Sequence, residues 1–122
     1  MTAERSGQKK ILIVEDFSAL RQAMRDVLNL EGFQVDQVAN GKEAVDYLKT
    51  KETPNAMIID YRLPVMGGAD LLDWMKSDPK YQSIFTIATS AASNETHCKT
   101  ANHFMKKPLD MNALIQLLRE KC

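Results

Sequence analysis

Residues 11–16 read ILIVED, four aliphatic side chains followed at once by two carboxylates. The same arrangement recurs at residues 56–60, AMIID, where one carboxylate follows the apolar run. A strand inside a parallel sheet needs apolar cover on both faces, so an unbroken aliphatic run of this length predicts a buried parallel strand. A polar side chain directly after such a strand lies at its carboxyl end, where open α/β sheets bind their ligands. The two stretches therefore predict a parallel sheet with a site along one edge.

Three further strands complete the pattern. Residues 84–88 form an apolar run that is followed by polar Thr89 and Ser90, and residues 104–105 are a brief run before a pair of lysines. Residues 33–38 alternate apolar and polar side chains. Because the apolar runs alternate with helix-periodic segments, we expect a three-layer, doubly wound, five-stranded parallel sheet with helices on both faces.

Helix signals lie between these strands. Apolar residues recur at helical spacing across residues 20–28, and Gly32 is placed to end that helix in a left-handed conformation. Asn40 and Glu43 have the spacing of a capping box before the next helix, and Asp110 is placed to cap the last one. The connections are therefore short, as a doubly wound sheet requires.

Composition indicates an ordinary globular domain. The chain has 122 residues, and 16 Lys and Arg balance 16 Asp and Glu, so no bulk charge favours nucleic acid or an anionic membrane. The two cysteines show no metal or disulfide spacing, which suits a reducing cytoplasm. We expect a polar tail over residues 1–9 and one domain over residues 10–122, with no membrane span and no output domain after it.

The polar groups at the predicted sheet edge point to a cation and an anion. Three carboxylates, on Glu15, Asp16 and Asp60, would repel one another unless a cation neutralised them, and Mg²⁺ prefers such oxygen ligands. The Ser90 hydroxyl and the Lys107 ammonium suit an anion such as a phosphoryl group. Each feature alone is more often a solvated turn, a loop cap or a surface charge, so the prediction depends on their combination.

The motifs taken together resemble the receiver domain of a two-component response regulator. They are Glu15-Asp16, residues 60–68 (DYRLPVMGG), Ser90-Ala91 and Lys107-Pro108, and they span nearly the whole chain. Residues 15–21 are particularly similar to single-domain chemotaxis-type receivers. The resemblance implies the flavodoxin-like strand order 2-1-3-4-5, which is a documented order for this class of fold.

The resemblance also implies a role for each acidic residue. Asp60 would be the phosphoacceptor nucleophile, forming an aspartyl phosphate. Asp16 and Asp60 would bind Mg²⁺ directly, the backbone carbonyl of Arg62 would be a third protein ligand, and Glu15 would act through water.

Ser90 would donate a hydrogen bond to a phosphoryl oxygen, and Ala91 after it would leave space for that group. Thr89 is adjacent and takes the role if the strand register shifts by one residue. Neighbouring residues of a strand face opposite sides, so only one of the two hydroxyls can serve.

Lys107, rather than its neighbour Lys106, would pair with Asp60 at rest and with the phosphoryl group afterwards, because it precedes proline as in the family. The resemblance also implies a cis peptide bond between Lys107 and Pro108. Phe104 stands where the family has an aromatic switch that moves inward after phosphorylation. Simple packing of a strand aromatic is an equally good interpretation of that residue.

The implied partners are a sensor histidine kinase or histidine phosphotransfer protein, which supplies the phosphoryl group, and a downstream protein target. No nucleic-acid or membrane partner is expected, and the only catalysis would be the chain's own phosphorylation and dephosphorylation. One departure from the family stands out. Lys107 lies 17 positions after Ser90 (107 − 90), which is fewer than receivers usually have. We therefore expect a short or irregular fourth helix between them, with Ser93 as its possible cap.

Two other functions compete with this interpretation. Haloacid-dehalogenase-type phosphatases also use a strand-end Asp nucleophile, but they need a second Asp two residues later, where this chain has Arg62. A receiver-like interaction module that works without phosphorylation would usually lack the acidic pair, the Asp or the Lys, all of which are present here. A DNA-binding regulator is disfavoured because no helix-turn-helix segment or basic face follows.

Overall fold

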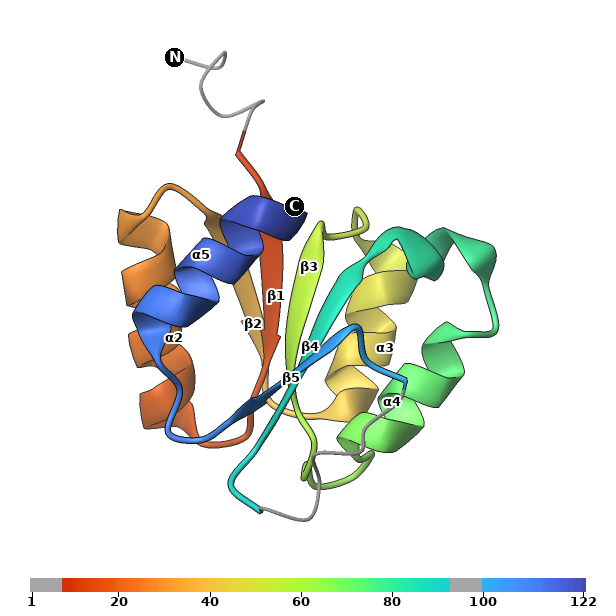
Figure 1. Cartoon of the computed structure of the whole chain (residues 1–122). Coiled ribbons are helices and arrows are strands. Elements are labelled where there is room, and N and C mark those ends of the chain that lie inside the picture. The colour runs from red at the N-terminus through yellow and green to blue at the C-terminus, as the bar shows by residue number, and fades with distance from the viewer. Residues whose placement is uncertain (1–7, 93–99) are drawn as a thin grey trace.

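The computed structural model describes residues 8–92 and 100–122, which form one parallel sheet covered by helices on both faces (Figure 1). The sheet has the order β2-β1-β3-β4-β5, and each neighbouring pair is parallel. This confirms the predicted doubly wound sheet and its strand order. The strands are β1 (Lys10–Val14), β2 (Gln34–Val38), β3 (Ala56–Asp60), β4 (Phe85–Ser90) and β5 (His103–Lys106).

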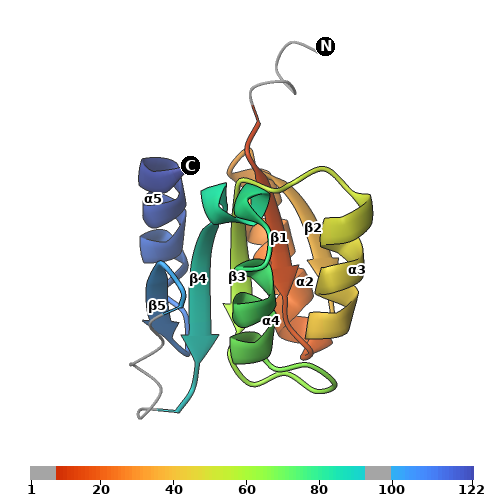
Figure 2. The same ribbon diagram turned by 90° about the vertical axis from the view of Figure 1, so that its right-hand side faces the viewer.

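The helices are divided between the two faces of the sheet. Figures 1 and 2 show α2 and α5 on one face and α3 and α4 on the other. A short 3-10 helix, η1, follows α4 and was not predicted from the sequence; Asp78 caps this turn and Pro79 begins it. The helices are α2 (Ser18–Leu30), α3 (Gly41–Thr50), α4 (Gly68–Met75), η1 (Pro79–Ser83) and α5 (Met111–Lys121).

The inner strand β1 explains why both layers of helices are needed. Ile11 and Ile13 pack in the core beneath α2 and α5, whereas Leu12 and Val14 pack in the core beneath α3 and α4. All four side chains are fully buried. The unbroken aliphatic run therefore supplies apolar surface to two cores at once, as its sequence predicted.

The predicted helix ends are also present. The Asn40 side chain accepts a hydrogen bond from the backbone N–H of Glu43 (2.8 Å), and the Glu43 carboxylate accepts one from Ala39 N–H (2.8 Å). Asp110 caps α5 by accepting from the backbone N–H of Ala113, and Gly32 has a φ of 97° after α2. Glu43 therefore reaches one residue further back than the capping-box pattern predicts.

Two predicted strand ends need correction. Asp60 and Ser90 are the last residues of β3 and β4, whereas the sequence placed the ends of these strands at Ile59 and Ala88. The reason is the ladder itself, because Asp60 pairs in register with Thr89, and Ser90 pairs with Lys106. The strands therefore continue through the polar residues that the sequence placed just beyond them.

The predicted helix from Ser93 lies outside the described residues, as does most of the expected N-terminal tail. Within residues 8–92 and 100–122, we find no helix with the length and apolar character that crossing a bilayer requires.

Candidate functional site

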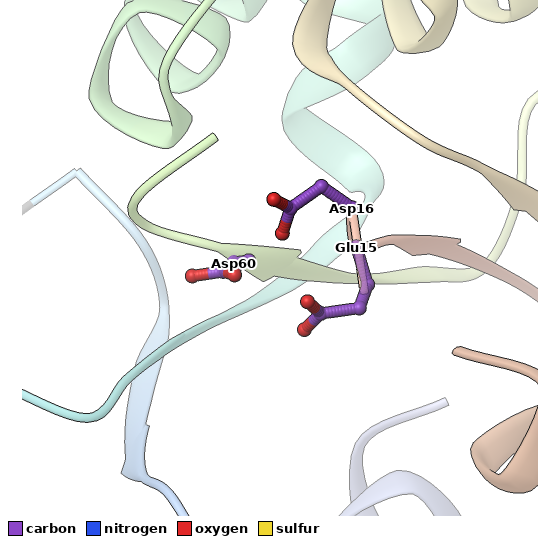
Figure 3. A group of neighbouring side chains, drawn as sticks. All are labelled: Glu15, Asp16 and Asp60. Carbon is purple, nitrogen blue, oxygen red and sulfur yellow. The ribbon is translucent and has the colours of Figure 1, made fainter. Parts of the chain in front are cut away.

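Three carboxylates gather at the carboxyl edge of the sheet (Figure 3). Glu15 and Asp16 directly follow β1, and Asp60 ends the neighbouring strand β3. One carboxylate oxygen from each of the three lies within 4.8 Å of the others. Glu15 and Asp60 are only 3% and 7% exposed, whereas Asp16 is open to solvent. The buried acidic groups therefore need a compensating positive charge.

Lys107 supplies that charge within the protein. Its Nζ lies 3.1 Å from Asp60 Oδ2, the contact expected from the sequence, and only 2.7 Å from Glu15 Oε1, a contact that the sequence analysis did not predict. The peptide bond between Lys107 and Pro108 is cis, as expected. Lys106 is exposed, in keeping with its interpretation as a surface charge. One ammonium group thus bridges two buried carboxylates.

The ionisation of this pair follows from burial and contact together. Burial raises the pKa of Glu15, and this effect outweighs the hydrogen bonds from Lys107 and from Phe17 N–H that favour the carboxylate. Burial alone would lower the pKa of Lys107, but its hydrogen bonds and charge interactions with Glu15 and Asp60 together raise it. Lys107 is therefore held in its protonated form.

Each buried carboxylate is oriented by two donors. Asp60 accepts from Lys107 on Oδ2 and from the backbone N–H of Arg62 on Oδ1 (3.1 Å). Glu15 accepts from Lys107 on Oε1 and from Phe17 N–H on Oε2 (3.1 Å). Among the described residues, no hydrogen bond or ion pair involves the Asp16 carboxylate. It is the acidic group best able to take an external cation.

This donor set fits Mg²⁺. Carboxylate and backbone carbonyl oxygens are the hard ligands that the ion prefers, and an open side toward solvent suits its tendency to keep several waters. Asp16 provides that open side, and Asp60 lies beside it.

The two candidate hydroxyls are both buried on β4. Thr89 and Ser90 are 2% and 1% exposed. Thr89 stands opposite Asp60 in the ladder, and its carbonyl accepts a hydrogen bond from the backbone N–H of Tyr61. Ser90 lies one residue further toward the edge, where its carbonyl accepts from the backbone N–H of Lys107 (2.9 Å). The backbone of Ser90 is thus hydrogen-bonded to that of Lys107. The catalytic role of Ser90 stays a prediction.

Phe104 lies on β5 opposite Ala88 and is half-buried. Phe104 therefore lies in the last strand, as the sequence predicted. Its role as a switch stays a prediction.

Sequence reasoning missed one side chain next to the acidic residues. Arg21 Nη1 donates to the backbone carbonyl of Glu15 (2.9 Å), and Arg21 Nε donates to Gln37 Oε1 on β2 (2.8 Å). Arg21 is the last residue of the stretch 15–21, which carried part of the resemblance. Its place in the sequence does not show which groups its side chain contacts.

An apolar cavity of about 490 Å³ adjoins the acidic site on the α2 and α5 side of the sheet. Its walls come from α2, from the residue after β4, and from the segment that joins β5 to the start of α5. The lining residues are Leu20, Ala23, Met24, Val27, Ala91, Lys107, Pro108, Leu109 and Met111.

Comparison with known proteins identifies the arrangement. The family model described as response regulator receiver domain matches residues 11–119. The polar-differentiation response regulator DivK of Brucella anthropi is 31% identical over 83 residues, which cover 68% of this chain and 67% of DivK. Sporulation initiation phosphotransferase F of Bacillus subtilis is 43% identical over 68 residues, covering 56% of this chain and 54% of that protein.

Solved structures of receiver domains have the same fold as this chain. A CheY-like response regulator receiver domain from Methylobacillus flagellatus has a TM-score of 0.85 and 27% identity, covering 95% of this chain and 100% of the other. The receiver domain of a sensor histidine kinase from Pseudomonas aeruginosa, described with a magnesium ion in its active site cleft, has a TM-score of 0.84 and 24% identity, covering 94% and 98% of the two chains.

Proposed function

Because the chain belongs to the response regulator receiver domain family, we propose that it is a phosphoacceptor in a two-component phosphorelay. It takes a phosphoryl group onto Asp60 in the presence of Mg²⁺ and signals to a protein partner by a change of conformation. The observation that carries the proposal is the Lys107 ammonium group, which bridges buried Asp60 and Glu15 beside exposed Asp16.

Asp60 is the nucleophile in this mechanism. The contacts from Lys107 and from Arg62 N–H hold its carboxylate at the strand end. One carboxylate oxygen forms a bond to phosphorus as the bond from phosphorus to the donor's imidazole nitrogen breaks, and the imidazole leaves with the bonding electron pair. Fixed positive charge near the transferred group accelerates such a reaction by positioning and electrostatics.

Mg²⁺, held by the Asp16 and Asp60 carboxylates, the Arg62 carbonyl and, through water, Glu15, would supply positive charge to the phosphoryl oxygens. Lys107 then exchanges its contact with Asp60 for a phosphoryl oxygen. Its contact with Glu15 keeps the ammonium group at the site during that exchange.

Ser90 and Phe104 carry the response. The added group brings about −1.5 to −2 charges near neutral pH, which attracts the Ser90 hydroxyl. Phe104 fills the space that the hydroxyl leaves, so phosphorylation shifts the population between two packings of β4 and β5. A downstream protein reads the altered face.

The donor is a sensor histidine kinase or a histidine phosphotransfer protein, and both act in the cytoplasm. The chain catalyses only its own phosphorylation and dephosphorylation, because Arg62 stands where a phosphatase of similar chemistry needs a second acidic side chain.

The test is intact mass after incubation with acetyl phosphate or phosphoramidate, with and without Mg²⁺. We expect one added phosphoryl group that is labile to hydroxylamine, depends on Mg²⁺ and is absent in Asp60→Asn. Asp70→Asn is the matched control, since Asp70 is an exposed aspartate in the first turn of α4. Wild-type protein that binds Mg²⁺ yet gains no mass would reject phosphotransfer and favour an interaction module that works without it.

The same assay decides between the two hydroxyls. Ser90→Ala should slow phosphorylation, whereas Thr89→Ala, an equally buried change one residue away, should not. The reverse result would assign the role to Thr89.

A further inference from the structure

The loop between β1 and α2 carries two of the three carboxylates, Glu15 and Asp16. The backbone of this loop is bonded to the sheet at its beginning, where the backbone N–H of Glu15 donates to the Val38 carbonyl of β2 (3.1 Å). The Glu15 carbonyl lies just past the β1 ladder, whose last pair is Val14 with Val38. Glu15 is buried, so its carbonyl needs a donor from elsewhere in the fold.

Arg21 is that donor. Its Nη1 reaches the Glu15 carbonyl (2.9 Å), and its Nε reaches Gln37 Oε1 on β2 (2.8 Å). Its own backbone N–H donates to Phe17 in the first turn of α2. One rigid guanidinium thus joins the acidic loop, the first helix and the neighbouring strand.

We propose that Arg21 is a positioning residue for the cation site, and the proposal rests on the Mg²⁺ binding of the proposed function. Arg21 acts through the backbone of Glu15 and keeps the Glu15 and Asp16 carboxylates facing Asp60. The contacts that the structure gives the Arg21 side chain are to a carbonyl and an amide oxygen. A lysine cannot replace it, because a single ammonium group does not offer two donors in a fixed fork.

The direction in which Mg²⁺ affinity changes when Arg21 is replaced distinguishes a positioning role from a purely electrostatic one. If Arg21 acted only as a nearby positive charge, its removal would tighten Mg²⁺ binding, because cations repel one another. If it positions the loop, its removal weakens binding. Loss of a side chain that orients metal ligands typically costs about 10–100-fold in metal affinity.

The experiment is a Mg²⁺ titration of the full chain followed by backbone amide shifts in NMR spectra. We expect Arg21→Ala and Arg21→Lys each to raise the Mg²⁺ dissociation constant by about tenfold. Gln37→Leu, which removes the second anchor of the guanidinium, should give a smaller increase. Arg25→Ala is the matched control, because Arg25 lies one turn further along α2, and its side chain pairs with the neighbouring Asp26 (2.9 Å).

A second readout needs no metal. Phe17 N–H donates to Glu15 Oε2, so its hydrogen exchange should quicken in metal-free Arg21→Ala, while exchange in β3 stays at the wild-type rate. Should Arg21→Ala fail to fold, Arg21→Lys and Gln37→Leu test the same contacts.

The outcomes are distinct. Wild-type Mg²⁺ affinity or tighter binding in both Arg21 variants would overturn the positioning role and leave the proposed function standing. Absence of Mg²⁺ binding in the wild-type protein would overturn both.

Discussion

Val65 has a φ of 68°, a left-handed conformation that is costly for a β-branched residue. It lies in the loop between β3 and α4, and its side chain is 77% exposed, so it contributes little to the core. The backbone N–H of Met66 donates to the Pro64 carbonyl (2.7 Å), so a tight turn closes around Val65 and holds it in this conformation.

Replacing Val65 by Asn should stabilise the protein by about 1 kcal/mol, because Asn tolerates the left-handed region. Denaturant unfolding should show a higher midpoint with an unchanged slope. Leu30→Asn is the control, since Leu30 is 87% exposed in an ordinary helix end and should have little effect. A lower midpoint for the Val65 variant would contradict the prediction.

Tyr47 illustrates how one hydrogen bond links stability to pH. Its hydroxyl donates to Asp36 Oδ2 (2.6 Å), and Lys10 Nζ lies 3.5 Å from the same carboxylate oxygen. Burial, followed by this hydrogen bond and by the charges of Asp36 and Glu52, raises the pKa of Tyr47 above its ordinary value of 10.0.

The sign of the pH effect follows from the proton count. Above pH 10 the unfolded chain loses the Tyr47 proton, whereas the folded protein keeps it, so folding stability falls as pH rises. Tyr47→Phe should cost about 1 kcal/mol at pH 7 through the lost hydrogen bond. The difference in unfolding free energy between wild type and variant should shrink above pH 10. A difference that stays constant to pH 11 would count against the raised pKa.

At the scale of elements, two helix starts frame the site. A Cβ on Gly68, the first residue of α4, would lie 2.6 Å from the Asp60 carbonyl oxygen, so α4 packs directly on the backbone at the end of β3. A Cβ on Gly41, the first residue of α3, would lie 2.8 Å from Met66 Cβ and closer still to the Met66 carbonyl oxygen. Glycine at both places permits helix ends to contact the β3–α4 segment.

Gly41→Ala should therefore destabilise the protein by about 1–3 kcal/mol, although alanine favours helix, because the backbone of Met66 must move. Thermal or denaturant unfolding measures the loss. Gly67→Ala provides the control, since the nearest atom to a Cβ there is 3.9 Å away. Equal stability of the two variants would show that the α3 contact is easily relaxed.

At the scale of the whole molecule, the sheet is most buried in its inner strands and less buried at its two edges, β2 and β5. The strands β1 and β3 are almost wholly buried, whereas β5 has four residues, none of them fully buried. Asn102, just before β5, ties this edge to β4. Its side-chain oxygen accepts from Thr86 N–H (2.8 Å) and Thr86 Oγ1 (3.1 Å), and its backbone N–H donates to Thr86 Oγ1 (3.0 Å).

Hydrogen exchange should therefore be slowest in β1 and β3 and faster in β5. Asn102→Ala should quicken exchange at residues 103–106 by about tenfold, since it removes the two hydrogen bonds that the Asn102 side chain accepts, each of modest net strength. Exchange in β1 should not change. Asn112→Ala, at an exposed position on α5, serves as the control. Uniform quickening across the sheet would mean that Asn102 supports the whole fold rather than its edge.

Prediction from the sequence worked best where the signal is local. The caps at Asn40 and Asp110 and the left-handed Gly32 depend on neighbours within four residues, and all three are present. The ends of β3 and β4 were each placed one residue or more too early, because the register with the next strand extends the ladder through Asp60 and Ser90. The turn η1 was missed because Asp78 and Pro79, the residues that begin it, are equally typical of a simple loop.

By itself, the sequence determined the alternation of buried strands and helices and the gathering of Glu15, Asp16, Asp60 and Lys107 at one edge. It could do so because apolar runs and the polar residues that end them are contiguous in the chain. Only the tertiary structure decided that Lys107 contacts Glu15 more closely than Asp60, that Arg21 holds the Glu15 carbonyl, and that α3 abuts Met66. The physical reason is that these contacts depend on how different elements pack together and not on residues adjacent in the chain: Lys107 and Glu15, for example, are 92 residues apart.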